Sequence, residues 1–321
     1  MGILFVGSSP DDLAGIATEN ITTAGRDPDF TPVGSKITGD FDEQGGGFSL
    51  IHDPGVSTVT WYHFLFNTTQ SSDYAGQADG YWFRIFSGTN LVAQLDVENS
   101  VWTLKGSTEV SAPFTPFVTD ADITYDVKVE ADGVNVTVVL YQNGVLTASI
   151  TYASAISAPT SMSFDHFDLV WDTTPRNYYY SECIVTDGES TIGWRLSTLN
   201  PAANGFHQAW VGDYTALLNI QDGVGITSDT VDQRESWTLT AYGGPVGPFR
   251  SVINKYLANV GDTGPQNVVP FWRIGGVDYD VAALTELGVP TLVFSDTNPA
   301  TGEAWTASDF TGIEHGVKGA V

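Results

Sequence analysis

The densest group of residues that could do acid–base chemistry lies in the segment 161–172, SMSFDHFDLVWD. Hydrolysis of a glycosidic bond needs two carboxyl groups that face one cleft. On a strand, Asp165 and Asp168 point to opposite faces because they are three residues apart, whereas Asp168 and Asp172 share a face with His166. The segment contains no glutamate. The pattern favours polar residues lining one side of a sheet, so we expect no catalytic residue and no enzymatic activity.

Residues that could bind a metal are few. The five histidines are scattered, without spacings such as HxxxH or HxH. They are His52, His63, His166, His207 and His315. Hard oxygen ligands in a glycine-containing loop suit Ca²⁺, and Asp73 and Asp79 in SSDYAGQADG supply them. We therefore expect no cofactor, and Ca²⁺ at these two aspartates is the open alternative.

Sugar binding would use aromatic rings and polar groups at loop tips. Five aromatic residues lie near polar loops, namely Trp61, Tyr62, Tyr74, Tyr81 and Trp82. The alternative interpretation places these rings in the core, because large aromatic side chains dominate such cores. Cys183, the only cysteine, excludes an internal disulfide and is predicted to be a buried small apolar residue.

The charge of the chain restricts its partners. There are 12 Lys and Arg residues against 38 Asp and Glu residues, a formal net charge of −26. Nucleic-acid backbones need clustered basic residues, and an anionic membrane surface would repel this chain. We expect no nucleic-acid binding and no membrane insertion. The expected partners are neutral, such as glycans, or protein surfaces.

The first residues, MGILFVGSSPDD, do not look like a signal peptide. They lack a basic region, and their apolar run is too short. No segment reaches transmembrane length. We therefore expect synthesis in a cytoplasm without a signal peptide.

Alternating apolar residues and two turn signals fill the segment 125–150, YDVKVEADGVNVTVVLYQNGVLTASI. Asp132-Gly133 and Asn143-Gly144 are hairpin signals. Because side chains alternate between faces along a strand, the loop lengths can be chosen so that apolar residues share one face. The first turn meets this condition with a two-residue loop, and the second with the three-residue loop 142–144.

These loops predict a three-stranded antiparallel meander with one face in a core. Val129 should oppose Val136, Leu140 should oppose Leu146, and Gly144 should have positive φ. The side chains expected in the core belong to Val127, Val129, Val136, Val138, Leu140 and Ile150. The side chains expected in water belong to Asp126, Lys128 and Thr137.

Similar short strand candidates continue on both sides of the meander, separated by Gly, Asn, Asp and Ser. They are 57–67, 79–88, 90–97, 101–106, 161–172 and 177–188. Many short antiparallel strands indicate a sandwich or barrel, and βαβ alternation is absent. The Gly/Pro run 243–248 is the expected boundary between parts of the chain.

Two segments carry helix signals. Apolar residues in 249–257 have helical spacing, which predicts a helix there. Near the end, Thr306 is a predicted cap with Asp309 three residues on, and Trp305 and Phe310 could form a hydrophobic staple.

Up to about residue 188 the sequence resembles the concanavalin A-like jelly roll of lectins, laminin-G-like modules and glucanases. The pieces that carry this resemblance are ADGVNVTVVLYQNGVLTASI and FDHFDLVWDTTPRNYYYSECIVTDG. It implies an all-β fold with an antiparallel jelly-roll β-sandwich. Glucanases of this fold have an E-x-D-x-x-E pattern on one strand, and this sequence departs from it.

The second half resembles structural proteins of tailed bacteriophages and gene-transfer particles. The resemblance is carried by SECIVTDGESTIGWRLSTLNPAANGFHQAWVGDYTALLN, TVDQRESWTLTAY and NPATGEAWTASDFTGIEHGVK. In those proteins a lectin-like sandwich is joined to a small β-module and a short tail. The resemblance implies an N-terminal arm (1–30), the sandwich (31–188), a small β-module (189–245) and a mixed helix/strand tail for assembly (246–321).

The same resemblance implies a non-enzymatic virion protein of a tail tip, fibre, spike or capsid surface. Its partners would be other virion proteins, copies of itself and a host cell-surface glycan. A free carbohydrate-binding lectin is one alternative, and a polysaccharide-degrading enzyme is another.

The two ends of the chain are unusually apolar for free termini. Exposed apolar patches mark interfaces, and closed symmetry is usual in homo-oligomers. We therefore expect an assembly interface that includes Phe5, Trp272, Trp305 and Phe310. The alternative is that both ends cover the sandwich of a monomer.

Overall fold

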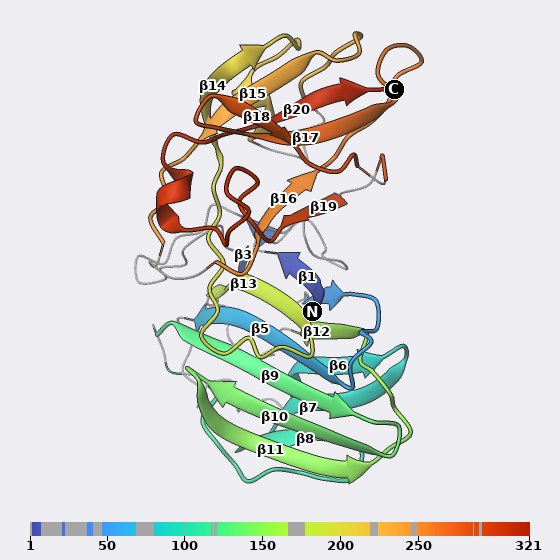
Figure 1. Cartoon of the computed structure of the whole chain (residues 1–321). Helices are drawn as coiled ribbons and strands as arrows, with labels where there is room; N and C mark the ends of the chain where they lie inside the picture. Colours follow the sequence, from blue (N-terminus) through green and yellow to red (C-terminus); the bar gives the residue numbers. More distant parts are fainter. Residues whose placement is uncertain are drawn as a thin grey trace. The chain divides into compact units, whose positions relative to one another are not determined.

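The computed structural model describes residues 2–7, 21–22, 37–40, 47–68, 80–99, 101–116, 118, 121–165, 177–218, 224–244, 249–284, 286–288 and 291–321. The chain divides into two compact units, Met1–Ser197 (unit 1) and Thr198–Val321 (unit 2) (Figure 1). Both are built from antiparallel strands, so the predicted all-β class is confirmed. In the part of the chain that the structure describes, no helix is long and apolar enough to cross a membrane.

Unit 1 contains a sandwich of two sheets. The larger sheet has the order β11-β10-β9-β5-β13-β3-β2, and β1 also pairs with β13. Its strands are β1 (Gly2–Gly7), β2 (Ile21–Thr22), β3 (Ile37–Asp40), β5 (Val59–Thr68), β9 (Ile123–Ala131), β10 (Asn135–Gln142), β11 (Val145–Ala153) and β13 (Asn177–Asp187). The smaller sheet has the order β4-β12-β6-β7-β8. Its strands are β4 (Gly47–Ile51), β6 (Gly80–Ser87), β7 (Asn90–Glu98), β8 (Val101–Lys105) and β12 (Ser161–Asp165).

An aromatic core joins the two sheets. Phe64 on β5 is fully buried and stacks on Tyr125 of β9 with ring centroids 5.0 Å apart. Its ring also meets Phe83 of β6 at 6.3 Å and Phe164 of β12 at 4.8 Å, both edge-on. Side chains of both sheets therefore share one core, as in the jelly-roll sandwich that the sequence predicts.

The predicted faces of the meander are confirmed in the core. All six side chains expected there are buried, namely Val127, Val129, Val136, Val138, Leu140 and Ile150. Gly144 has φ +75°, as predicted. Lys128 and Thr137, on the opposite face, are partly exposed.

The predicted pairing within the meander is wrong by two residues at both turns. Val129 opposes Val138, because the carboxylate of Asp132 accepts hydrogen bonds from two backbone N–H groups and lengthens the first loop to 132–135. The second loop contains only Asn143 and Gly144, both with positive φ, and a bulge at Leu140/Tyr141 keeps the faces in phase. Leu146 consequently lies outside, 60% exposed. A shift of two residues preserves the faces because the side-chain period is two.

Asp126 was expected in water, and the structure buries it completely. Its Oδ1 atom accepts a hydrogen bond from Thr191 Oγ1 at 2.7 Å and lies 2.8 Å from His63 Nδ1. Thr191 belongs to residues 189–197, which we call the strap. The strap also places Arg195 Nε and Nη2 each 2.7 Å from the carboxylate of Glu182, which is fully buried. Asp126 is therefore covered because the strap returns over the outer face of the larger sheet.

Unit 2 contains a five-stranded sheet with the order β14-β15-β20-β17-β18. Its strands are β14 (Pro201–Gln208), β15 (Arg234–Leu239), β17 (Asn267–Ile274), β18 (Val277–Asp280) and β20 (Glu314–Ala320). A second sheet pairs β16 (Val252–Tyr256) with β19 (Thr291–Ser295). The described part of this unit also contains the 3₁₀ helices η2 (Tyr214–Leu217) and η3 (Ala307–Phe310).

Two expectations for this half are wrong. The helix predicted in 249–257 is the strand β16, whose β-branched residues Val252 and Ile253 suit pairing with β19. The run 243–248 does not separate two parts, because β15 before it pairs with β20 after it. Residues 198–321 therefore form one unit in place of the predicted β-module and tail.

The C-terminal aromatic residues fill a core of their own instead of an assembly interface. Trp272, Trp305 and Phe310 are buried together with Ile313, and the rings of Trp305 and Phe310 stack at 5.6 Å. The predicted cap is also present, since Thr306 N donates to Asp309 Oδ2 at 2.7 Å. These aromatic rings are unavailable to a second copy because they face one another within unit 2.

The N-terminal strand completes the larger sheet of unit 1. Phe5 on β1 opposes Val185 of β13 and packs, partly buried, against the core of unit 1. This arrangement fits the alternative in which an end of the chain covers the sandwich.

Candidate functional site

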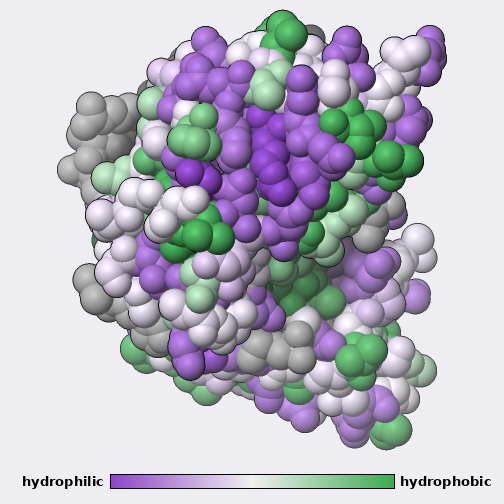
Figure 2. Space-filling view, turned by 45° about the horizontal axis from the view of Figure 1, so that its top comes forward, coloured by the Kyte–Doolittle hydropathy of each residue, from purple (hydrophilic) through white to green (hydrophobic). Residues whose placement is uncertain are grey.

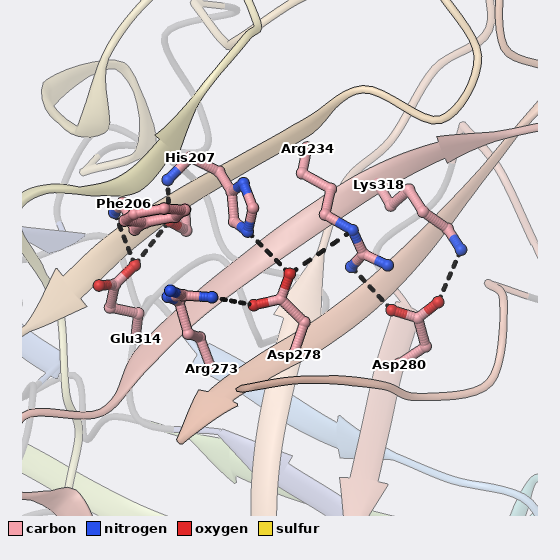
Figure 3. Close-up of polar contacts among 9 residues, drawn as sticks. Phe206, His207, Arg234, Arg273, Asp278, Asp280, Glu314 and Lys318 are labelled. Atoms are coloured by element: carbon pink, nitrogen blue, oxygen red, sulfur yellow. Dashed lines mark hydrogen bonds and ion pairs between the residues drawn. The ribbon is translucent and has the colours of Figure 1, made fainter. Parts of the chain in front are cut away.

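One face of the five-stranded sheet in unit 2 gathers charged and aromatic side chains. On β17, Trp272 points into the core, so Phe271 and Arg273 point to the other side. Arg273 lies opposite Asp278 of β18 and Glu314 of β20. We call this surface the network face. Figure 3 labels eight of its residues, namely Phe206, His207, Arg234, Arg273, Asp278, Asp280, Glu314 and Lys318. The ninth is Phe271, whose ring contacts Arg234 and His207. In the space-filling view, hydrophilic residues gather over unit 2 (Figure 2).

Two aspartates on β18 contact the basic side chains of the network face. Asp278 lies 2.7 Å from both Arg273 Nη1 and His207 Nε2, and 3.7 Å from Arg234 Nε. Asp280 lies 2.7 Å from Arg234 Nη1 and 2.6 Å from Lys318 Nζ. The dashed lines in Figure 3 mark these contacts, whose residues come from all five strands of the sheet.

The network face differs from the rest of the surface in its balance of charge. Its acidic groups are Asp278, Asp280 and Glu314, and its basic groups are Arg234, Arg273 and Lys318. The chain as a whole carries only 12 basic residues and a net charge of −26. The face therefore presents donors and acceptors together without the strong negative field of the rest of the chain.

Asp278 and Asp280 both have lowered pKa values, so their carboxylates stay ionised to lower pH than usual. Burial acts to raise the pKa of Asp278, but hydrogen bonds from Arg273 and His207 outweigh it and hold the pKa below its usual 3.8. Burial likewise acts to raise the pKa of Asp280, and the contacts with Arg234 and Lys318 reverse that effect. The two carboxylates are permanent acceptors at neutral pH.

These shifts predict acid sensitivity in unit 2. Because the folded-state pKa values are lowered, the carboxylates contribute stability that is present above the unfolded-state pKa and is lost as pH falls through the folded-state pKa. We expect the urea midpoint of the unit 2 transition to fall as pH decreases from about 5 to about 2. The Asp278→Asn variant should show a smaller decrease over the same range. An equal decrease in variant and parent would contradict this assignment.

A buried ring supports the network from below. Phe271 is fully buried, with the Arg234 guanidinium carbon 4.6 Å from its ring centroid and the His207 ring edge-on at 5.7 Å. A side chain at Gly316 would meet this ring at 2.4 Å, so glycine is needed for Phe271 to lie across β20. The Phe271 ring thus lies between the sheet and the side chains of Arg234 and His207 and supports both of them.

A second ring, Phe206, stands at the edge of the network face. Its backbone N–H donates to Glu314 Oε2 at 2.8 Å, and Ser236 Oγ donates to the same oxygen at 2.7 Å. Arg273 lies over the Phe206 ring, with its guanidinium carbon 4.0 Å from the centroid. The Phe206 side chain is nevertheless 67% exposed.

Three of the five aromatic residues that the sequence analysis proposed for sugar binding are buried in the structure. Tyr62 is fully buried, and Trp61 and Trp82 are nearly so, hence these three rings cannot stack on a sugar and that expectation is corrected. The reason is packing: Trp61 stacks on Tyr141, and Trp82 Nε1 donates to the hydroxyl of Tyr180 at 2.7 Å.

The remaining predicted site residues have mixed outcomes. Tyr81 is partly exposed, and the Arg84 guanidinium carbon lies 3.9 Å from its ring centroid. Tyr74, Asp73 and Asp79 lie outside the described residues, as do 166–176. Among the described residues, no group of three or more His, Cys, Asp or Glu side chains could hold a metal ion.

The network face was missed at the sequence level because its members come from five separate strands. One local signal was available. The segment FWRIGGVDYD carries the two-residue turn Gly275-Gly276, and that hairpin places Arg273 opposite Asp278. Nothing local indicates that His207, Arg234 and Lys318 join them.

No protein-family model matches this chain, and no curated protein matches it. Several solved structures show weak similarity. The botulinum neurotoxin serotype D ligand-binding domain in complex with N-acetylneuraminic acid is 10% identical over 94% of this chain and 79% of its own, with a TM-score of 0.39. Alginate lyase AlgAT5 from polysaccharide lyase family 7 is 12% identical over 57% of this chain and 92% of its own, with a TM-score of 0.37. A sialidase is 8% identical over 48% of this chain, with a TM-score of 0.37, and this chain covers only 15% of it. The ligands and activities in these names belong to those proteins, and similarity at this level carries no functional argument for this chain.

Proposed function

We propose that this chain is a non-enzymatic structural protein of a phage-type virion, and that the network face of unit 2 contacts a glycan on a cell surface. The virion role is supported by the resemblance of its second half to phage and gene-transfer-particle proteins. The all-β architecture of both units suits a surface component built for rigid presentation of side chains.

The observation that carries the binding role is the pairing within the network face. A general acid needs a carboxyl group whose pKa is raised toward the working pH. Asp278 and Asp280 have lowered pKa values and are held by Arg273, Arg234 and Lys318. Groups fixed in this way keep their protonation state and suit recognition of hydroxyl groups better than proton transfer.

The proposal predicts two results with the full chain. In density gradients of particles from a culture that produces it, the chain should sediment with the particles at a fixed copy number. The purified chain should be retained on immobilised bacterial surface polysaccharide without releasing new reducing ends. Sedimentation apart from the particles would contradict the virion role, and steady release of oligosaccharides would contradict the non-enzymatic role.

A further inference from the structure

Phe206 is held in place more firmly than an exposed phenylalanine needs to be. The carboxylate of Glu314 receives its backbone N–H, and Ser236 Oγ receives the N–H of the next residue, His207, at 3.0 Å. A Cβ at Gly205 would lie 2.4 Å from Glu314 Oε2 and 2.5 Å from Ser236 Oγ, so the strand before the ring also leaves no room for a side chain. These contacts fix the backbone that carries the ring.

The ring itself is backed on one face. Arg273 lies 4.0 Å from the ring centroid and is itself fixed by Asp278 at 2.7 Å. With one face covered by the guanidinium group and 67% of the side chain exposed, the opposite face of the ring is open to solvent. A fixed aromatic surface of this kind binds a ligand at low entropic cost, because it is already ordered.

Polar groups surround the base of the ring. The side chains of His207, Arg273 and Asp278 are each 15–23% exposed. A ligand that stacks on the open face of Phe206 would therefore meet the His207 side chain at the edge of the ring, whereas Arg273 holds the ring from its covered face. Pyranose sugars match this arrangement, because one face of the ring carries C–H groups and the rim carries hydroxyls.

From this arrangement we propose that Phe206 is the stacking platform for a neutral polysaccharide, with His207, beside the edge of the ring, as a hydrogen-bonding partner for its hydroxyl groups. The inference rests on the proposed glycan contact and specifies its residue and its ligand class. A neutral ligand is preferred because the balanced charges of the network face offer no excess of basic groups, and the net charge of −26 repels acidic polymers.

Affinity electrophoresis tests this with the full chain, which migrates strongly because its pI is about 4.1. Native gels would contain dextran, galactomannan or mixed-linkage β-glucan, and parallel gels would contain alginate or hyaluronate. We expect retardation by at least one neutral polymer. Phe206→Ala should weaken that affinity about tenfold, and Phe206→Leu similarly, whereas Phe206→Trp should preserve it.

Val211→Ala is the matched control, because Val211 is also exposed and apolar in unit 2 but is not part of the network face. Equal urea midpoints for parent and variants would show that folding is unchanged. Parent and Phe206→Ala retarded equally by a neutral polymer would overturn the platform and leave the glycan contact standing. Retardation by the acidic polymers alone would overturn the neutral class, and retardation by none of the five would overturn both this inference and the proposed glycan contact.

Discussion

Replacing Val138 with aspartate is expected to lower the free energy of unfolding by more than about 4 kcal/mol. Val138 is fully buried in the middle of β10, between Val129 and Ile150. A carboxylate there would have apolar neighbours on both adjacent strands. Equilibrium unfolding in urea measures the change as a shift of the midpoint.

Thr137→Asp is the matched control, one residue earlier on the same strand. Thr137 lies on the opposite face, partly exposed, and its hydroxyl is 3.0 Å from that of Thr151. A surface substitution of this kind should change the stability by only about 0.5 kcal/mol. Similar losses in both variants would show that the two faces of β10 are not distinguished as the structure has them.

Arg195→Ala is expected to destabilise unit 1 by about 3 kcal/mol. Glu182 is fully buried beside the strap and receives two hydrogen bonds from the guanidinium group of Arg195, each 2.7 Å long. Removing the arginine takes the counter-charge from a carboxylate that water does not reach. Arg195→Lys should recover part of the loss, because lysine restores the charge but not the two-pronged geometry.

Lys128→Ala is the control for the strap. Lys128 pairs with Glu130 at 2.7 Å on the surface of the same unit, where an ion pair contributes about 0–1 kcal/mol. Urea unfolding of the three variants should therefore rank them Arg195→Ala, Arg195→Lys and Lys128→Ala in order of decreasing loss. Equal losses of stability in Arg195→Ala and Lys128→Ala would contradict the assignment of Arg195 as the partner that stabilises the buried carboxylate of Glu182.

The faces of the strands could be predicted from the sequence, and the pairing between strands could not. Alternation places Val136 and Val138 in the core whatever the register, as long as any shift is even. The register itself depends on how the Asp132 side chain lengthens one loop and where a bulge falls in β10. Neither feature changes the apolar pattern, so the pattern could not reveal them.

Residues whose surroundings come from distant parts of the chain were also beyond local prediction. Asp126 sits in an alternating strand pattern that indicates exposure, but Thr191 of the strap covers it. The segment 249–257 has helical spacing, yet pairing with β19 makes it a strand. The network face is the extreme case, since His207, Arg234 and Lys318 are brought together only by the order of strands in the sheet.

The order of strands in unit 2 has a consequence for synthesis. β20, the last strand, lies in the middle of its sheet, between β15 and β17. Unit 1 ends at Ser197, so its sandwich can form while the ribosome is still translating the rest of the chain. The sheet of unit 2 must wait until residue 320 has been released, and β15 and β17 keep unpaired edges until then. A chain truncated before β20 would therefore carry a folded sandwich attached to an open, aggregation-prone sheet.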